Sequence, residues 1–490
     1  MNPLHKILLA LAALSLAACS KSLPKEYDSL GEKPALSIDL DSVAVPVNIA
    51  PLNFRIEEEG SDYITHIYTG QQPDGMVLGG RDLDIPVGRW HSLAASAQGD
   101  SITISVFAKS GGKWRRYAPV KIAVADSIDP YISYRLIEPS YIGFEQMAIC
   151  QRHLENFDER EIFENQALST EDEGQCINCH SYQNYNRTGN MQMHVRGRLG
   201  GTVIAHNGTL KMVNLKSPET ISNGVYPSWH PTEPLIAYSL NETTQTFHSR
   251  DIDKIEVQDS HSDLVLYDPV TDSVKFIVND SLRLETFPYW HPDGKSLWYV
   301  AADVPYVPEE KMSEFHADEY QTVKYDLYRI SFDPATRAFG EPERILAASE
   351  MEASVTLPRP SPDGRYLLFT VGNYGTFHIW HRESDLYLLD IANQTLRPAH
   401  ELNSPNVESY HSWSSNGRWV IFSTRRDDGS YTRLYIAHFR PDGTFSKPFP
   451  LPQSTPDADL NRMKSYNIPE FMACPVTISK RRLIETILGQ

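Results

Sequence analysis

The sequence predicts a mainly β protein. A β-propeller of six or seven blades is expected to follow an N-terminal β-sandwich-like domain and a small helical insertion. The chain has 490 residues, with 33 Pro, 27 Gly and 25 Tyr, a composition that favours strands joined by turns. Period-two alternation marks the first part of the chain, and a strand–turn–strand unit repeats in the last part. Between them, Ala148 to about Leu168 is the only long helical candidate.

The first residues are typical of a targeting segment. Residues 1–18 combine Lys6 with an apolar run over residues 7–16, which is too short to span a bilayer. Leu16-Ala17-Ala18-Cys19 resembles the bacterial lipobox, which implies that Cys19 is lipidated and becomes the mature N-terminus. Ser20 resembles an outer-membrane sorting signal, so we expect an outer-membrane lipoprotein of the cell envelope that faces the periplasm. The alternative is an ordinary signal peptide with a chance cysteine.

Residues 19–38 are polar and are expected to tether the lipid to the fold. Residues 39–126 alternate apolar and polar side chains, as in Ser101–Val106, and Pro73-Asp74-Gly75 marks a turn. This pattern predicts the β-sandwich-like domain. It carries no function by itself.

A repeat begins after Gly200 and predicts the propeller over residues 195–472, with a C-terminal tail at 473–490. In each copy a turn joins two strands, and the apolar run after the turn is a buried central strand. The four copies are Pro227–Tyr238, Pro288–Tyr299, Pro358–Phe369 and Ser412–Phe422. Two strand pairs per unit make a four-stranded blade. The strand expected at Tyr131–Ile137 is a candidate to close the ring.

These copies resemble the TolB-like branch of WD40-like propellers, whose motif is a Pro-Asp-Gly-Lys/Arg turn followed by an apolar strand. Pro292-Asp293-Gly294-Lys295 carries the motif in full. The first copy departs from it at Thr232-Glu233-Pro234, and the third copy lacks the tryptophan. The resemblance implies a cell-envelope propeller.

The motif Cys176-Ile177-Asn178-Cys179-His180 lies in the segment 127–194 and has the C-x-x-C-H spacing of c-type cytochromes. This resemblance implies one covalent haem c, with thioether bonds at Cys176 and Cys179 and with His180 as the proximal iron ligand. A zinc site is an alternative, although no second C-x-x-C exists. A thioredoxin-like redox pair is another, although the βαβ context that it needs is absent.

Further candidate residues surround the motif. The distal iron ligand is expected to be Met193 or His194, with Met191 a weaker choice. Arg196 and Arg198 either pair with haem propionates or are ordinary solvated residues. Cys150 and Cys474 either form a disulfide or remain free thiols; the sequence does not decide between these.

The net charge of −18 excludes nucleic-acid binding, because the phosphate backbone repels an acidic protein. The chain also resembles the hydrazine synthase alpha subunit at Val45–Phe54, which implies a shared combination of propeller and haem; that family carries a second C-x-x-C-H that is missing here. The sequence therefore predicts an electron-transfer lipoprotein that docks redox partner proteins of the cell envelope on its propeller. A haem enzyme with an open iron site and a TolB-like scaffold with structural haem are the alternatives. No hydrolase signature is present.

Overall fold

The computed structural model describes residues 21–138, 146–170, 176–248, 253, 255–304 and 307–489. The expected lipidation site, Cys19, lies outside the described residues. The chain divides into two compact units. The first comprises Met1–Ser127 and Pro452–Asn461, and the second comprises Ile128–Leu451 and Arg462–Gln490.

The first unit is a β domain with one short helix packed on it. Its strands are β1 (Asp28–Ser29), β2 (Ala44–Pro46), β3 (Asp62–Thr69), β4 (Met76–Gly79), β5 (Ser101–Ser110), β6 (Lys113–Arg116) and β7 (Val120–Ala125), and its helices are α2 (Val87–Ser96) and α4 (Ala458–Asn461). Trp90 of α2 is fully buried and donates its indole N–H to the Ile49 carbonyl at 3.0 Å. The predicted β domain is confirmed, but all seven strands join in one sheet. The reason is the length of β5, which pairs with β7 through its first half and with β6 through its second.

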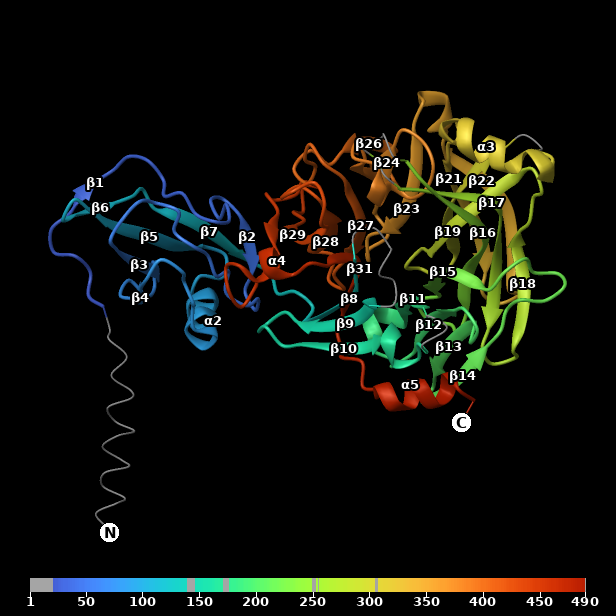
Figure 1. The fold of residues 1–490 in the computed structure, drawn as a ribbon, viewed down its shortest axis with the longest axis horizontal. Coiled ribbons are helices and arrows are strands. Elements are labelled where there is room, and N and C mark those ends of the chain that lie inside the picture. Colours follow the sequence, from blue (N-terminus) through green and yellow to red (C-terminus); the bar gives the residue numbers. More distant parts are fainter. Residues whose placement is uncertain are drawn as a thin grey trace, which may run out of the picture. The chain divides into compact units, whose positions relative to one another are not determined.

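The second unit consists of six four-stranded groups, which we call blades 1 to 6. Figure 1 shows them, from green to red, standing around a common centre. Blade 1 contains β31 (Ser465–Met472), β8 (Tyr131–Ile137), β9 (Ala148–His153) and β10 (Glu159–Glu164). Blade 2 contains β11 (Cys176–Tyr182), β12 (Met191–Arg196), β13 (Gly201–His206) and β14 (Thr209–Val213). Blade 3 contains β15 (Gly224–Trp229), β16 (Ile236–Phe247), β17 (Ile255–Asp268) and β18 (Ser273–Val278).

The other three blades follow in chain order. Blade 4 contains β19 (Arg283–Trp290), β20 (Ser296–Asp303), β21 (Asp326–Asp333) and β22 (Ala338–Leu346). Blade 5 contains β23 (Ser354–Pro360), β24 (Tyr366–Gly372), β25 (Asp385–Asp390) and β26 (Thr395–Pro398). Blade 6 contains β27 (Glu408–Trp413), β28 (Trp419–Thr424), β29 (Arg433–His438) and β30 (Phe449–Pro450). A single parallel pair, Ser262 with Leu284, also links blades 3 and 4.

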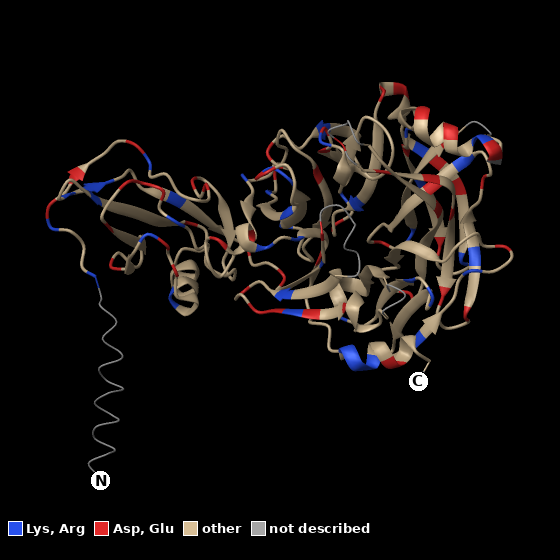
Figure 2. Ribbon diagram, in the orientation of Figure 1, with Lys and Arg blue, Asp and Glu red and all other residues tan. Residues whose placement is uncertain are grey.

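Short helices lie in the connections and at the C-terminus. They are η2 (Asn165–Ala167), η3 (Gln183–Asn186), η4 (Glu309–Lys311), α3 (Met312–Asp318), η5 (Tyr320–Thr322), η6 (Ser349–Met351), η7 (His378–Trp380) and α5 (Lys480–Ile487). Helix α5 lies beside β14 and buries Leu483 and Ile487 against blade 2, so much of the tail expected at 473–490 is packed. Figure 2 shows basic side chains on this helix; Arg481 and Arg482 are exposed, and Lys480 pairs with Glu161 and Glu164 of β10.

The ring closes through strands from both ends of the unit. Strand β31 near the C-terminus pairs antiparallel with β8, and it contacts β27 and β11 on either side. The expectation that Tyr131–Ile137 closes the ring is confirmed. The boundary expected at residue 195 is wrong, because residues 131–196 already form three strands of blade 1 and the first two strands of blade 2.

The helix expected from Ala148 to about Leu168 is also wrong. Strands β9 and β10 occupy most of that segment and pair antiparallel. A turn separates them, in which the Asn156 side chain accepts the N–H of Asp158 at 2.8 Å. Because β10 is the edge strand of blade 1, its charged side chains can face solvent, and this produced the charged pattern that suggested a helix.

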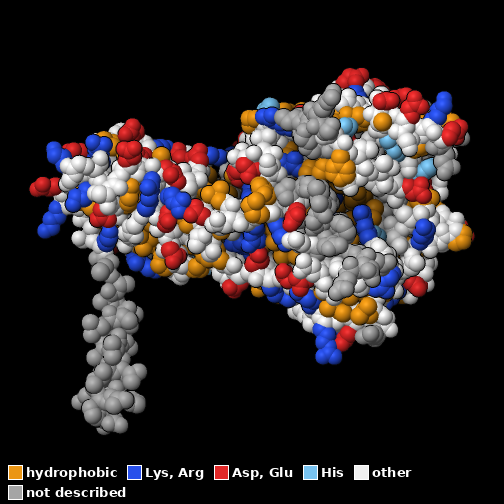
Figure 3. Space-filling view, in the orientation of Figure 1, with side chains coloured by type: hydrophobic (Ala, Val, Ile, Leu, Met, Phe, Trp, Pro, Cys, Tyr) orange, Lys and Arg blue, Asp and Glu red, His pale blue; other side chains and the backbone are white. Residues whose placement is uncertain are grey.

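The repeat unit itself is confirmed. Trp229, Trp290 and Trp413 close the inner strands of blades 3, 4 and 6 and pair with equivalent residues of the next strand. Buried apolar clusters join neighbouring blades, such as the cluster that contains Trp298, Val300 and Phe369. Figure 3 shows charges of both signs interspersed over the described face of this unit.

Candidate functional site

The C-x-x-C-H motif lies on β11, the inner strand of blade 2, and not on a helix. The backbone turns into the left-handed region at Cys179, where φ is 45°, and the pairing with β12 shifts register between Asn178 and Ser181. All six inner strands have this kink. The equivalent residues are Tyr226, Phe287, Leu357, Tyr410 and Ile468, with φ between 45° and 53°. The motif is therefore in register with the propeller repeat.

This alignment gives every motif residue a counterpart in the other blades. The residue after the kink is His180 in blade 2, and its counterparts are Pro227, Pro288, Pro358, His411 and Pro469. The sequence held a signal for this register, because Cys179-His180-Ser181-Tyr182 resembles Tyr410-His411-Ser412-Trp413. That similarity was missed while the motif was assigned to a separate insertion.

The kinked residues line a chamber at the centre of the ring. Its volume is about 30 Å³, and its wall also includes His180, Arg359 and Glu470. That volume holds a water molecule or two. A porphyrin is too large for this chamber.

His180 is a buried imidazole that reaches the backbone carbonyl of Ile468 but has no side-chain partner among the described residues. It is 2% exposed, and among the described residues neither ring nitrogen makes a hydrogen bond of good geometry. Burial, with the nearby Arg135 guanidinium, lowers the pKa of His180 to about 3, so the ring is neutral at physiological pH. His411, its counterpart in blade 6, instead uses Nε2 to bond the Leu368 carbonyl at 2.8 Å.

The two cysteines stand at different depths on β11. Cys176 begins the strand opposite Arg196 and is partly exposed, whereas Cys179 is 5% exposed and lines the chamber. Burial raises the pKa of the Cys176 thiol, and Arg196 and Arg135 oppose that rise. Both thiols are free.

Hydrogen bonds fix the backbone of the motif. The Asn165 side chain accepts the Ile177 N–H at 2.8 Å, and the Asn178 side chain accepts the Cys179 N–H at 2.8 Å and an N–H of Arg135. Gln192 donates to the Cys179 carbonyl. Two thiols and one buried imidazole, the residue types that a covalent haem requires, stand on this strand, but the space beside Cys179 and His180 is too small for a porphyrin.

The other predicted ligands lie on β12, the next strand. Met191 and Met193 face the apolar cluster between blades 1 and 2, where Met193 is fully buried. His194 faces the other side of the sheet, opposite Asn178, and its Nδ1 is buried without a partner. Burial lowers the pKa of His194 to about 3. Both methionines therefore pack in the apolar core. His194 is the residue of the three that has a buried donor atom without a partner, its Nδ1.

The predicted arginines are both exposed, and only Arg196 pairs opposite a motif residue, Cys176. Two arginines were missed, the buried Arg135 beside Asn178 and the half-buried Arg359 in the chamber wall. Their signal was weak, since each is a single charge inside an apolar strand. Cys150 is buried and Cys474 exposed, and both are free thiols, so they do not form a disulfide.

Within the described ranges, no group of three or more His, Cys, Asp and Glu side chains is placed to hold a metal ion. The same residues include no helix of the length and apolar character that a membrane crossing requires.

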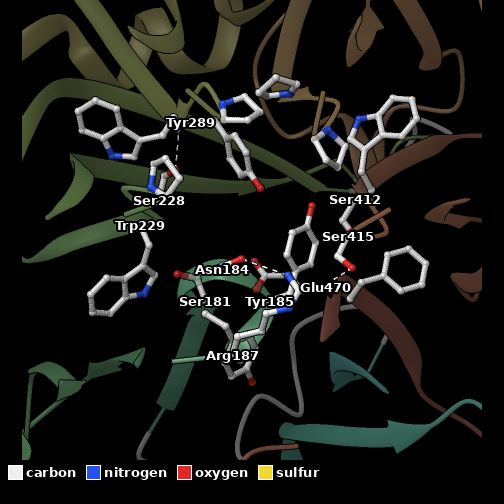
Figure 4. Close-up of a pocket in the computed structure, with 18 of the residues that line it drawn as sticks. Ser181, Asn184, Tyr185, Arg187, Ser228, Trp229, Tyr289, Ser412, Ser415 and Glu470 are labelled. Atoms are coloured by element: carbon white, nitrogen blue, oxygen red, sulfur yellow. Dashed lines mark hydrogen bonds between the residues drawn. The ribbon is translucent and has the colours of Figure 1, made fainter. Parts of the chain in front are cut away.

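A second and larger cavity opens where the inner strands end. It measures about 320 Å³ and is shown in Figure 4. Aromatic side chains from five blades line it: Tyr182, Tyr185, Trp229, Tyr289, Trp290, Trp413 and Phe471. Glu470 borders both this pocket and the central chamber.

No protein family matches the chain, and no curated protein matches it. Solved structures do. A Mycobacterium tuberculosis puromycin-hydrolysing peptidase is 10% identical over 65% of this chain and 45% of its own, with a TM-score of 0.39. An oligogalacturonate lyase in complex with manganese is 12% identical over 64% of this chain and 84% of its own, with a TM-score of 0.33. A prolyl endopeptidase is 11% identical over 66% of this chain and 42% of its own, with a TM-score of 0.35.

The chain thus spans less than half the length of the peptidase and of the prolyl endopeptidase. These neighbours are β-propeller proteins, in keeping with the ring of blades. At these scores the likeness carries no argument about what this chain binds or does.

Proposed function

We propose that this chain is a lipid-anchored c-type haem protein of the cell envelope that transfers electrons. Cys176 and Cys179 would form the thioether bonds, and His180 would be the iron ligand from the protein. The observation that supports the proposal best is the His180 imidazole, which is buried and neutral directly after C-x-x-C and has no side-chain hydrogen-bond partner among the described residues. An unsatisfied buried polar group costs about 1–3 kcal/mol, and coordination would remove that cost.

The surrounding residues prepare His180 for this role. Only a neutral imidazole can ligate a metal, and burial together with Arg135 keeps the proton away. The bonds from Gln192 to the Cys179 carbonyl and from Arg135 to Asn178 hold the backbone on both sides of the kink. A bound haem would supply a one-electron couple. The propeller would provide a rigid platform for redox partner proteins.

The test compares His180→Ala with a matched control, His411→Ala, at the equivalent position of blade 6. Both variants remove a buried imidazole from the same place in the repeat. We expect the wild-type protein to show a haem spectrum that changes on reduction, His180→Ala to change that spectrum, and His411→Ala to leave it unaltered. A haem-free wild-type protein, or two variants with the same spectrum, would contradict the proposal.

A haem enzyme is the second candidate. One observation favours it: the 320 Å³ pocket is lined by Ser181, the residue that follows His180. A substrate in that pocket would lie beside the strand that carries the motif. Binding of carbon monoxide to the reduced wild-type protein distinguishes the two, because an open iron binds it and an iron with two strong protein ligands does not.

A further inference from the structure

The pocket at the end of the inner strands has apolar walls and a polar interior. Trp229, Trp290 and Trp413 stand at equivalent positions of three blades and contribute to the lining, although each indole is largely buried between blades. The volume of about 320 Å³ falls within the range of small-ligand sites.

Three polar groups point into this space from different strands and loops. Figure 4 shows the phenol rings of Tyr185 and Tyr289 reaching into the pocket from opposite sides, with Glu470 labelled beside Tyr185. Among the described residues, neither phenol hydroxyl has a hydrogen-bond partner. The backbone N–H of Tyr182 bonds the Glu470 carboxyl group. The three groups are close neighbours, because ionisation of one would affect the pKa of another.

All three groups are hydrogen-bond donors at neutral pH. Burial raises the pKa of both phenols, so they keep their protons. Burial also raises the pKa of Glu470 to about 8, against the opposing effect of Arg359, so this carboxyl group is largely protonated. A neutral carboxylic acid beside tyrosine hydroxyls can donate to an oxygen that carries negative charge.

The nearby charges favour the same kind of ligand. The Arg359 guanidinium lies 4.2 Å from the centre of the Tyr289 ring, and Arg187 lies 5.5 Å from the centre of the Tyr185 ring. The Asp129 side chain accepts hydrogen bonds from the backbone N–H and the hydroxyl of Ser415, which lines the pocket. Arg187 lines this pocket and Arg359 lines the adjoining chamber, so a positive charge lies beside each of the two phenol rings.

We propose that this pocket binds a flat aromatic ligand through an oxygen substituent, of the phenolate or conjugated keto class. The oxygen accepts hydrogen bonds from Tyr185, Tyr289 and Glu470, and the ring packs between the aromatic walls. This site is separate from the haem proposal, because none of its three donors belongs to the C-x-x-C-H motif.

The test uses three probes of similar size and isothermal titration calorimetry at pH 7 with the full-length protein. They are 4-nitrophenol, its methyl ether 4-nitroanisole, and the trimethylanilinium cation. We expect 4-nitrophenol to bind at least about tenfold tighter than either other probe, because only its oxygen can carry the negative charge. Preferential binding of trimethylanilinium would contradict the proposal and indicate a cation site. Absence of binding by all three probes would also overturn it.

Variants of each polar residue test which side chains donate hydrogen bonds to the ligand. Tyr185→Phe and Tyr289→Phe should each weaken 4-nitrophenol binding by about tenfold, and Tyr299→Phe, on β20 outside the pocket, should leave it unchanged. Glu470→Gln keeps an N–H donor and should preserve binding, whereas Glu470→Leu should weaken it by about tenfold. Wild-type affinity in both phenylalanine variants would contradict the assigned contacts. Cys176→Ser should retain the affinity even if it abolishes haem attachment, which separates the two proposals.

Discussion

A buried ion pair joins the hairpin of blade 3 to the segment that follows η7, and its contribution to the free energy of unfolding can be worked out. Glu256 of β17 is 2% exposed, and His381, which follows η7, is 1% exposed. The His381 Nε2 atom lies 3.2 Å from the Glu256 carboxylate, which also accepts the Tyr374 hydroxyl at 2.8 Å. The change is Glu256→Gln, which keeps the shape and removes the charge.

The expected cost depends on pH, because the pKa of His381 is raised in the folded state. Burial disfavours its charge, but the hydrogen bond and charge of Glu256, with smaller contributions from Glu383 and Asp253, raise the pKa of His381. The neighbouring His378 opposes the charge and has its own pKa lowered to about 3, mainly by burial. A raised folded-state pKa contributes stability below the unfolded pKa of about 6.5, and that contribution is lost as pH rises through the folded pKa.

Removing one partner of a buried pair costs about 3–5 kcal/mol, and the amide retains some hydrogen bonding. We therefore expect Glu256→Gln to lower the free energy of unfolding by about 3 kcal/mol at pH 6. The loss should shrink well above the folded pKa of His381. Urea unfolding followed by tryptophan fluorescence from pH 5.5 to 9 measures both values.

The same hairpin supplies the control. Glu242 of β16 pairs with His261 at 3.1 Å, but both side chains are more than half exposed. Glu242→Gln should therefore change stability by less than about 1 kcal/mol at every pH. A cost for Glu256→Gln that is the same at pH 6 and pH 9, or no larger than that of Glu242→Gln, would refute the reasoning.

Three further predictions concern the core, the iron and the lipid anchor. Trp298→Ala should lower the free energy of unfolding by about 3–5 kcal/mol in urea titrations, because this residue is 1% exposed in the cluster between blades 4 and 5; a cost below 1 kcal/mol would show that the cluster is loosely packed. Met193→Leu should cost less than about 1.5 kcal/mol and leave any haem spectrum unchanged, and a spectral shift would identify Met193 as an iron ligand after all. Cys19→Ala should release the protein from the membrane fraction or leave its precursor uncleaved, whereas unchanged membrane association would exclude lipidation.

The propeller could be predicted because its evidence repeats along the chain. Each inner strand ends in a residue such as Trp229 or Trp290, and a turn and an apolar strand follow. Because the pattern occurs four times, the departures in single copies do not obscure the repeat. Blades 1 and 2 lack the turn motif, and blade 1 takes β31 from the far end of the chain, so local patterns could not reveal them.

The sequence identified the residues of the candidate site, but it did not predict the secondary structure around them. The spacing of Cys176, Cys179 and His180 pointed to haem attachment, but a helical insertion was expected around it. The charged strand β10 resembles an exposed helix face in sequence, since an edge strand tolerates the same side chains. The pocket could not be foreseen, because Tyr185, Tyr289 and Glu470 are far apart in sequence and meet only when the ring closes.

The central claim is that Cys176 and Cys179 hold a haem covalently. Mass spectrometry of the peptide that contains residues 176–180, from denatured protein produced in a host with a c-type haem attachment system, tests it most directly. The account predicts a peptide that carries one haem and resists thiol alkylation. A peptide with two unmodified thiols that alkylate freely would contradict it.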